Sequence, residues 1–172
     1  MNPVMETILE RRSIRSYKPE QLTDEQTKQI LDSGLWAPTA RNEQEVQFVC
    51  VQKPEILEEL KKDFSASIDA DFRDFIYGAP TFVFLFGHKA FPFTDIDGGI
   101  AVENMALSAE ALGLSSVIIG CICKMMAGPL GEKWFDRFGI SKNSKFIIGL
   151  AVGTKSAETS KRDRNDGRVS FF

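Results

Sequence analysis

Gly98-Gly99-Ile100-Ala101-Val102 opens the stretch GGIAVENMALSAEAL, residues 98–112, which has almost no polar side when it is drawn as a helix. A helix that is apolar nearly all round must be buried nearly all round. A chain of 172 residues builds one core of limited depth, so burying both faces of this helix requires a second surface. The stretch therefore predicts a helix that ends at Gly113, with one face on the core and the other at an interface.

Around this helix the sequence alternates between helix and strand patterns. Thr23-Asp24-Glu25-Gln26 has the form of a capping box and opens a helix that Pro38 ends. This helix should run to about Leu35 and face inward with Ile30, Leu31 and Leu35. TFVFLF, residues 81–86, is apolar throughout, as a strand buried on both faces should be. Further helices are expected at 3–11, 53–62, 66–77 and 132–138, and further strands at 46–51, 116–119 and 146–152.

The order of these elements predicts the fold class. Helices and strands mix without strict βαβ alternation, which favours an α+β fold over a doubly wound one. The chain has no internal repeat, low-complexity tract or linker, so we expect a single domain over residues 1–172.

Composition and charge exclude several classes of function. The formal net charge of −3 and the pI near 5.3 argue against nucleic acid as a partner. No apolar run approaches a membrane span, and the N-terminus lacks the apolar stretch of a signal peptide. Cys50, Cys121 and Cys123 are odd in number, which indicates a reducing, cytoplasmic compartment. These cysteines and the only histidine, His88, cannot build a tetrahedral zinc site without carboxylates, so no metal is expected.

The familiar catalytic and nucleotide-binding motifs are absent from the sequence. No G-x-G-x-x-G follows a strand, no P-loop pattern occurs, and no G-x-S-x-G elbow is present. His88 lies just after the apolar strand and is best interpreted as a strand-end residue. A Rossmann dinucleotide site, a P-loop and a serine or cysteine hydrolase are therefore not expected.

A cluster of basic residues near the N-terminus points to an anion. Arg11-Arg12-Ser13-Ile14-Arg15 carries three guanidiniums and a hydroxyl before the extended segment Ser16-Tyr17-Lys18-Pro19. Arginine forks match the geometry of phosphate and carboxylate groups and form charge-assisted hydrogen bonds. Taken alone, such a cluster is more often a solvated basic turn. A second basic group at 161–168 favours one small anion held from two sides.

A second constellation is APTARNEQ, residues 37–44. On an extended chain, Asn42 and Gln44 would place their amides on one face. Amides both donate and accept, which suits a heterocycle edge with alternating C=O and N–H groups. Taken alone, an Asx-type turn is the better interpretation.

Together these motifs resemble the nitroreductase family of FMN flavoproteins. Arg-Arg-Ser-x-Arg, Ala-Pro-Thr-Ala-x-Asn-x-Gln about 25 residues on, and Asp97-Gly98-Gly99-Ile100-Ala101 leading to Leu112-Gly113-Leu114 stand in the family's order and spacing. The similarity extends through residues 149–153 and a basic tail that ends in Val169-Ser170-Phe171.

The resemblance implies a nitroreductase-like fold with a central mixed, mainly antiparallel sheet flanked by helices. It also implies an intertwined homodimer whose C-terminal tail reaches the partner, with two FMN molecules at the subunit interface. The helix at 98–112 would then meet the partner with its second face.

The resemblance also assigns cofactor-binding residues. The phosphate and the flavin edge would be held by Arg11, Arg12, Ser13 and Arg15, with Lys161, Arg162 and Arg164 of the tail closing on the phosphate. The isoalloxazine and ribityl chain would be lined from the other subunit by Pro38, Thr39, Ala40, Asn42 and Gln44. The backbone of Ile119-Gly120-Cys121 would pass beside the ring, where a glycine allows close approach.

The implied activity is that of an FMN-dependent oxidoreductase. NADH or NADPH would pass hydride to flavin N5, and a nitroaromatic, quinone or similar electron-poor acceptor would then take its place, giving ping-pong kinetics. The flavin would carry out the hydride transfer, and positive charge from Arg15 would tune the reactivity of the flavin. The alternative is an FMN-binding sensor or carrier without turnover, favoured by Val46 where relatives often have an aromatic residue.

Overall fold

The computed structural model describes residues 2–68, 73–161, 163–164 and 166–172. Over these ranges the chain forms the helices α1 Pro3–Glu10, α2 Asp24–Leu35, η1 Ala40–Asn42, α3 Pro54–Ser67, α4 Thr94–Ala111, α5 Cys123–Met126, α6 Pro129–Phe138 and η2 Asp166–Arg168, and the strands β1 Gln47–Val51, β2 Thr81–His88, β3 Ser115–Ile119 and β4 Ser144–Gly153.

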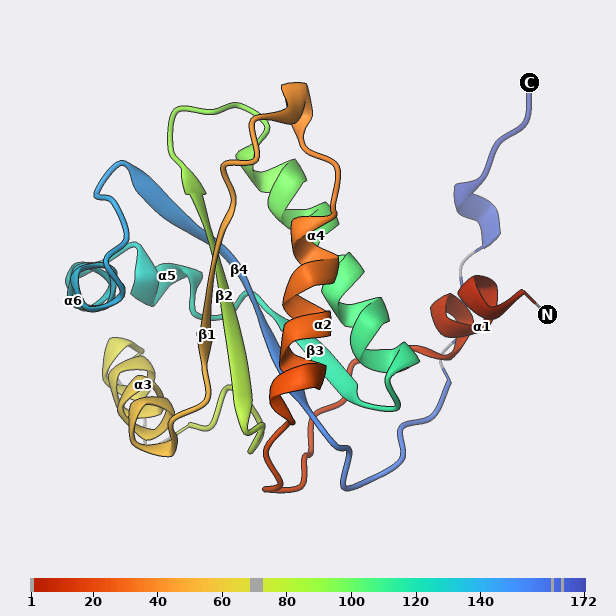
Figure 1. Ribbon diagram of the computed structural model, residues 1–172, viewed down its shortest axis with the longest axis horizontal. Helices are drawn as coiled ribbons and strands as arrows, with labels where there is room; N and C mark the ends of the chain where they lie inside the picture. Colours follow the sequence, from red (N-terminus) through yellow and green to blue (C-terminus); the bar gives the residue numbers. More distant parts are fainter. Residues whose placement is uncertain (1, 69–72, 162, 165) are drawn as a thin grey trace.

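The four strands form one sheet in the order β1-β2-β4-β3, and each neighbouring pair is antiparallel. A parallel pairing occurs at the isolated bridge between Ser13 and Ser116 on β3. The helices α2 and α4 cover one face of the sheet, and α3, α5 and α6 lie on the other side (Figure 1). The predicted α+β class is confirmed.

The central strand β2 is buried on both faces, as its sequence predicts. Phe82, Phe84 and Phe86 belong to the core on the α3–α6 side, whereas Val83 and Leu85 belong to the core under α2 and α4. The aromatic residues pack edge to face or stacked, with the Phe82 and Phe84 ring centroids 4.6 Å apart. This central strand therefore joins the two cores.

The helix α4 begins at Thr94, four residues before the predicted start, and ends as predicted. Gly113 has φ +73°, and Leu114 N–H donates to Ala109 O at 2.9 Å, which is a Schellman ending. One face of α4 packs on the sheet and α2, and it includes Ala101, Met105 and Ala106. The other face leaves a stripe exposed at Ile96, Gly99 and Ile100.

The helix α2 has the predicted capping box between Thr23 and Gln26, with both reciprocal hydrogen bonds present. Ile30 is buried, but the prediction that Leu35 faces inward is wrong, because Leu35 is 66% exposed. Gly34 occupies the inward position of that turn, where an added Cβ would lie 3.0 Å from Met105. The close approach of α2 to α4 therefore favours glycine at position 34, and the Leu35 side chain points away from α4.

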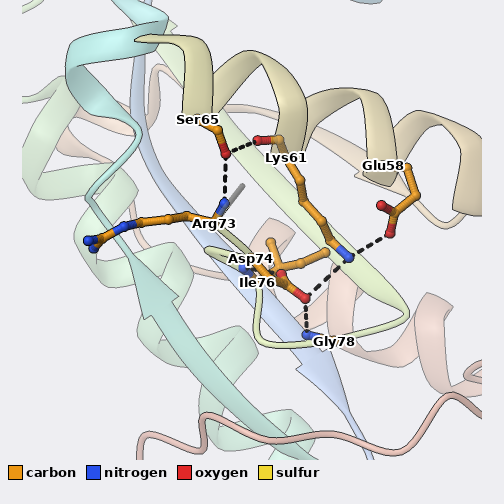
Figure 2. A network of polar contacts seen from close by, with 7 residues as sticks. All are labelled: Glu58, Lys61, Ser65, Arg73, Asp74, Ile76 and Gly78. Carbon is orange, nitrogen blue, oxygen red and sulfur yellow. Dashed lines mark hydrogen bonds and ion pairs between the residues drawn. The ribbon is translucent and has the colours of Figure 1, made fainter. Parts of the chain in front are cut away.

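The helix predicted at 66–77 is also wrong over its described part. The helix α3 continues to Ser67, and residues 75–78 form a turn, while residues 69–72 lie outside the described ranges. Polar contacts tie this turn to α3 (Figure 2). Ser65 Oγ accepts from Arg73 N–H at 2.7 Å, and the carboxylate of Asp74 accepts from Ile76 N–H and Gly78 N–H at 3.0 and 2.8 Å.

Lys61 lies at the centre of this network and is buried. Its Nζ lies 2.8 Å from Glu58 Oε1 and 3.2 Å from Asp74 Oδ2. Burial alone would lower the pKa of Lys61, but the two carboxylates outweigh burial and raise it. The turn is therefore fixed by side-chain bonds that a helix periodicity does not reveal.

Candidate functional site

The N-terminal basic segment is attached to the edge of the sheet. Ile14 N–H donates to Ser116 O at 3.0 Å, and Ile14 itself is buried. The chain then continues past the end of β4, where Lys18 N–H donates to Thr154 O at 2.8 Å and Ser156 N–H donates to Ser16 O at 3.0 Å. Residues 11–18 are therefore an ordered part of the fold, and they bring the chain after β4 alongside them.

The three arginines of this segment have different surroundings. Arg11 Nε lies 3.3 Å from Glu103 Oε1 on α4. Arg12 Nη1 donates to the carbonyls of Leu9 and Arg11 at 2.6 and 2.7 Å. Arg15 is exposed, and its Nη1 is 3.4 Å from Ser13 O.

A polar cavity of about 270 Å³ lies between the basic segment and the chain after β4. Arg12 and Lys161 both line it, so the structure brings together one residue from each predicted basic group. The cavity is lined by Glu10, Arg12, Ile14, Glu110, Ser115, Lys155, Glu158, Thr159 and Lys161. Its size suits a phosphate group with adjoining atoms rather than a whole dinucleotide or flavin.

Sequence reasoning missed Lys155, which lines the cavity and could have been noticed as the first cation after the last strand. Arg164 is exposed and does not line the cavity, and Arg162 lies outside the described residues. Carboxylates also face the space. Burial raises the pKa of Glu110, while Lys155, Arg11 and Arg12 oppose that rise. The cavity therefore brings three cations together with three carboxylates, from Glu10, Glu110 and Glu158.

The segment Pro38–Gln44 is not extended, so the predicted alternation of Asn42 and Gln44 is wrong. The short helix η1 forms instead, and Arg41, Asn42 and Gln44 have φ of +56°, +56° and +51°. Each non-glycine residue in this region costs roughly 1–2 kcal/mol, less for asparagine. The two amides still meet, because Gln44 Nε2 donates to Asn42 Oδ1 at 2.8 Å.

Contacts within the segment and from α4 hold this shape. Gln44 N–H donates to Thr39 Oγ1 at 3.1 Å. Ala40 N–H donates to both carboxylate oxygens of Asp97 at 3.1 Å, and Asp97 is only 2% exposed. Pro38, Asn42 and Gln44 are exposed, so this polar loop faces outward from the chain.

The turn after β3 presents open backbone. Ile119 is buried, whereas Gly120 and Cys121 are exposed. A Cβ on Gly120 would meet only Ile148 Cδ1, at 3.5 Å, so the backbone there is accessible to a ligand. Burial is the main cause that raises the pKa of both Cys121 and Cys123, which keeps these thiols protonated at neutral pH.

The two predicted halves of the site lie toward opposite ends of α4 (Figure 1). The loop 38–44 is bonded to Asp97 near the start of the helix, whereas Glu110 lines the cavity near its end. Thirteen residues of helix separate these positions by about 20 Å. One chain therefore does not bring Pro38–Gln44 to Arg12 and Lys161.

Two further observations concern only the described residues. None of their helices is long and apolar enough to cross a membrane. They also contain no group of three or more histidine, cysteine or acidic side chains placed to hold a metal ion.

Comparison with known proteins agrees with this architecture. The family model described as "Nitroreductase family" matches residues 8–154. An NADPH-flavin oxidoreductase of Vibrio harveyi is 31% identical over 163 residues, covering 89% of this chain and 66% of the relative. An FMN reductase [NAD(P)H] of Bacillus subtilis is 27% identical over 186 residues, covering 95% and 70%. The chain thus spans about two thirds of the length of these curated relatives.

A solved structure covers the whole chain. The nitroreductase with bound FMN from Bacteroides fragilis superposes with a TM-score of 0.93 at 26% identity, over 100% of both chains. The family model covers the described elements from the end of α1 to β4, and the predicted motifs at 11–15, 37–44 and 97–114 fall inside it, whereas the basic tail from residue 161 lies beyond the match. The chain is therefore a member of the nitroreductase family.

Proposed function

We propose that the protein is an FMN-dependent NAD(P)H oxidoreductase that works as a homodimer with two shared active sites. The observation that carries this proposal is the separation of the two half-sites along α4. A second copy of the chain, related by two-fold symmetry, would bring the loop of one subunit to the cavity of the other. The names and the bound FMN of the similar proteins support the choice of cofactor and reductant.

The residues around the cavity fit the phosphate end of FMN. Arg12 and Lys161 would supply cations from two segments, Thr159 would supply a hydroxyl, and Lys155, which pairs with Glu158 at 2.9 Å, would act less directly. The Arg12 guanidinium is already held by two backbone carbonyls, so little side-chain entropy is lost when it binds an anion. Arg11 is proposed to act less directly, because it pairs with Glu103.

The rest of the cofactor would lie outside the cavity. Gly120 and Cys121 would offer backbone to the ring, and the loop 38–44 of the partner subunit would cover it with the Asn42 and Gln44 amides. When bound, FMN supplies the hydride chemistry. Arg15 is exposed, and we propose that it places positive charge near the flavin edge. Nitroaromatics, quinones or similar electron-poor compounds are the proposed acceptors.

Exposed apolar residues support a subunit interface. The helix α1 has no buried residue and exposes Val4, Met5, Ile8 and Leu9. Trp36, at the end of α2, is 86% exposed, and α4 adds its stripe at Ile96 and Ile100. Apolar side chains exposed in such number on one small chain mark an interaction surface. We also propose a cytoplasmic location, supported by the three free cysteines.

A cis–trans complementation experiment tests the shared site. One half is impaired by Arg12→Ala and the other by Asn42→Ala, and heterodimers are purified through two different tags. In the trans arrangement each chain carries one substitution, so one site is intact and the other carries both defects. In the cis arrangement one chain carries both substitutions and its partner none, so each site carries one defect.

We expect the trans heterodimer to keep about half the wild-type NADH- or NADPH-dependent menadione reductase activity, because one of two symmetric sites is intact. The cis heterodimer, with the same substitutions, should be far weaker. A cis heterodimer more active than the trans one would place the whole site in one chain and overturn the proposal. A wild-type protein that binds FMN but reduces neither menadione nor nitrofurazone would leave the non-catalytic FMN-binding alternative.

A further inference from the structure

The loop Thr39–Gln44 has a backbone shape that its own residues do not favour. Three of its non-glycine residues, Arg41, Asn42 and Gln44, have positive φ. Backbone of this kind persists only where the surrounding structure over-determines it. The contacts that fix the loop from outside therefore decide how it presents its exposed amides.

The first outside contact is Asp97 of α4. Its carboxylate is buried, and both of its oxygens accept from Ala40 N–H, the amide that opens η1. Asp97 lies in the first turn of α4, where the helix dipole favours negative charge. A buried carboxylate needs such compensation. From the first turn of the helix, the Asp97 carboxylate is therefore directed at one backbone amide of the loop.

The second outside contact is Glu45, at the end of the loop. Glu45 Oε2 accepts from His88 N–H at 2.6 Å, at the end of β2, and Thr94 Oγ1 lies 2.7 Å from Glu45 Oε1. Thr94 opens α4 and is buried. Glu45 thus ties the loop to the end of β2 and to the start of α4, three residues before Asp97.

Resting on the function proposed above, we propose that Asp97 and Glu45 are positioning residues of the active site. They fix the two ends of the loop Thr39–Gln44 to the first turn of α4, and this fixes where Asn42 and Gln44 meet the flavin of the partner subunit. They touch the loop backbone and its anchoring elements, and they act on the cofactor through the loop.

The first test uses the apoprotein and does not depend on FMN. Hydrogen exchange is followed by mass spectrometry in peptides covering residues 38–46 and 81–87. Asp97→Leu removes both acceptor oxygens with the same number and branching of side-chain heavy atoms, and should speed exchange in the loop peptide by about tenfold, the loss of one charge-assisted hydrogen bond. Asp97→Asn keeps one acceptor for Ala40 N–H and should stay close to wild type. The control is Asp95→Asn, on an exposed carboxylate two residues away that pairs with Lys145.

The second test measures the bound flavin. Asp97→Leu should weaken FMN binding about tenfold and change the visible circular dichroism of bound FMN, and Asp97→Asn should restore both. Glu45→Leu should have the same two effects. Its control is Glu55→Leu, because Glu55 is an exposed glutamate on α3, on the opposite side of the sheet. A residue that only stabilises the fold would not change the flavin spectrum in a variant that remains fully folded.

The outcomes separate this proposal from the proposed function. If Asp97→Leu also speeds exchange in peptide 81–87, the substitution has unfolded the chain, and the Glu45→Leu variant then decides the outcome. If the folded leucine variants exchange the loop amides at the wild-type rate, the positioning role is overturned. It is also overturned if the loop amides exchange faster while the FMN affinity and the flavin circular dichroism are unchanged. A wild-type protein that binds no FMN overturns the proposed function, whereas the loop-exchange result would still show that the carboxylates hold the loop.

Discussion

Replacing Arg12 with alanine should weaken FMN binding far more than riboflavin binding. The guanidinium lines the cavity and is held in place by the carbonyls of Leu9 and Arg11. Removing a hydrogen bond to a charged group costs about 1.5–3 kcal/mol. That free energy corresponds to a loss of about ten- to a hundredfold in FMN affinity. Ser13→Ala removes only a neutral donor and should lose less.

The assay is an equilibrium titration of the apoprotein, followed by the change in flavin fluorescence on binding. Riboflavin lacks the phosphate, so its Kd should be nearly the same for wild type and Arg12→Ala. Lys62→Ala is the control, because Lys62 is exposed on α3, on the opposite side of the sheet. Equal loss of both flavins in a folded Arg12→Ala variant, or no loss of either, would refute a phosphate role for this residue.

Three further changes test other parts of the structure. Burial raises the pKa of Glu110, so ionisation of this side chain destabilises the fold as pH rises above the usual glutamate range. In urea unfolding, Glu110→Gln should therefore be more stable than wild type at pH 7 but not at about pH 4. Gly149→Ala would place a Cβ 2.2 Å from Phe82 Cζ and should lower the free energy of unfolding by about 1–3 kcal/mol; an unchanged urea midpoint would contradict this packing. Ile100→Glu, on the exposed stripe of α4, should give folded monomers by light scattering. Ala106→Glu should instead unfold the chain, because Ala106 is fully buried. A stable dimer of Ile100→Glu would show that the subunit interface does not include this stripe.

The parts of the fold that follow local rules could be predicted from sequence. The strand TFVFLF is apolar at every position, and the capping box at Thr23 depends on residues three apart. The Schellman ending at Gly113 needs only a glycine after an apolar helix. In each case the residues that determine the structure are neighbours in the chain.

Tertiary contacts determine what the sequence could not predict. The positive φ of Arg41, Asn42 and Gln44 contradicts local preference, and the loop depends on Asp97, more than fifty residues away. Lys155 reaches the cavity only because residues 16 and 18 pair with the chain after β4. The exposure of Leu35 follows from the close contact of Gly34 with Met105. Helical periodicity in the sequence does not reveal such contacts between distant residues.

The pairing of residues 13–14 with β3 also protects the sheet. β3 is an edge strand, and an uncovered edge offers unpaired backbone groups to other chains. The basic segment covers part of that edge through the Ile14–Ser116 hydrogen bond, while Arg12 and Arg15 place charge beside it. A chain shortened past Tyr17 would thus lose more than the proposed phosphate-binding residues. It would remove Ile14 and Tyr17 from the core and expose Ser115–Ile119 as a template for strand addition, so such truncations should aggregate.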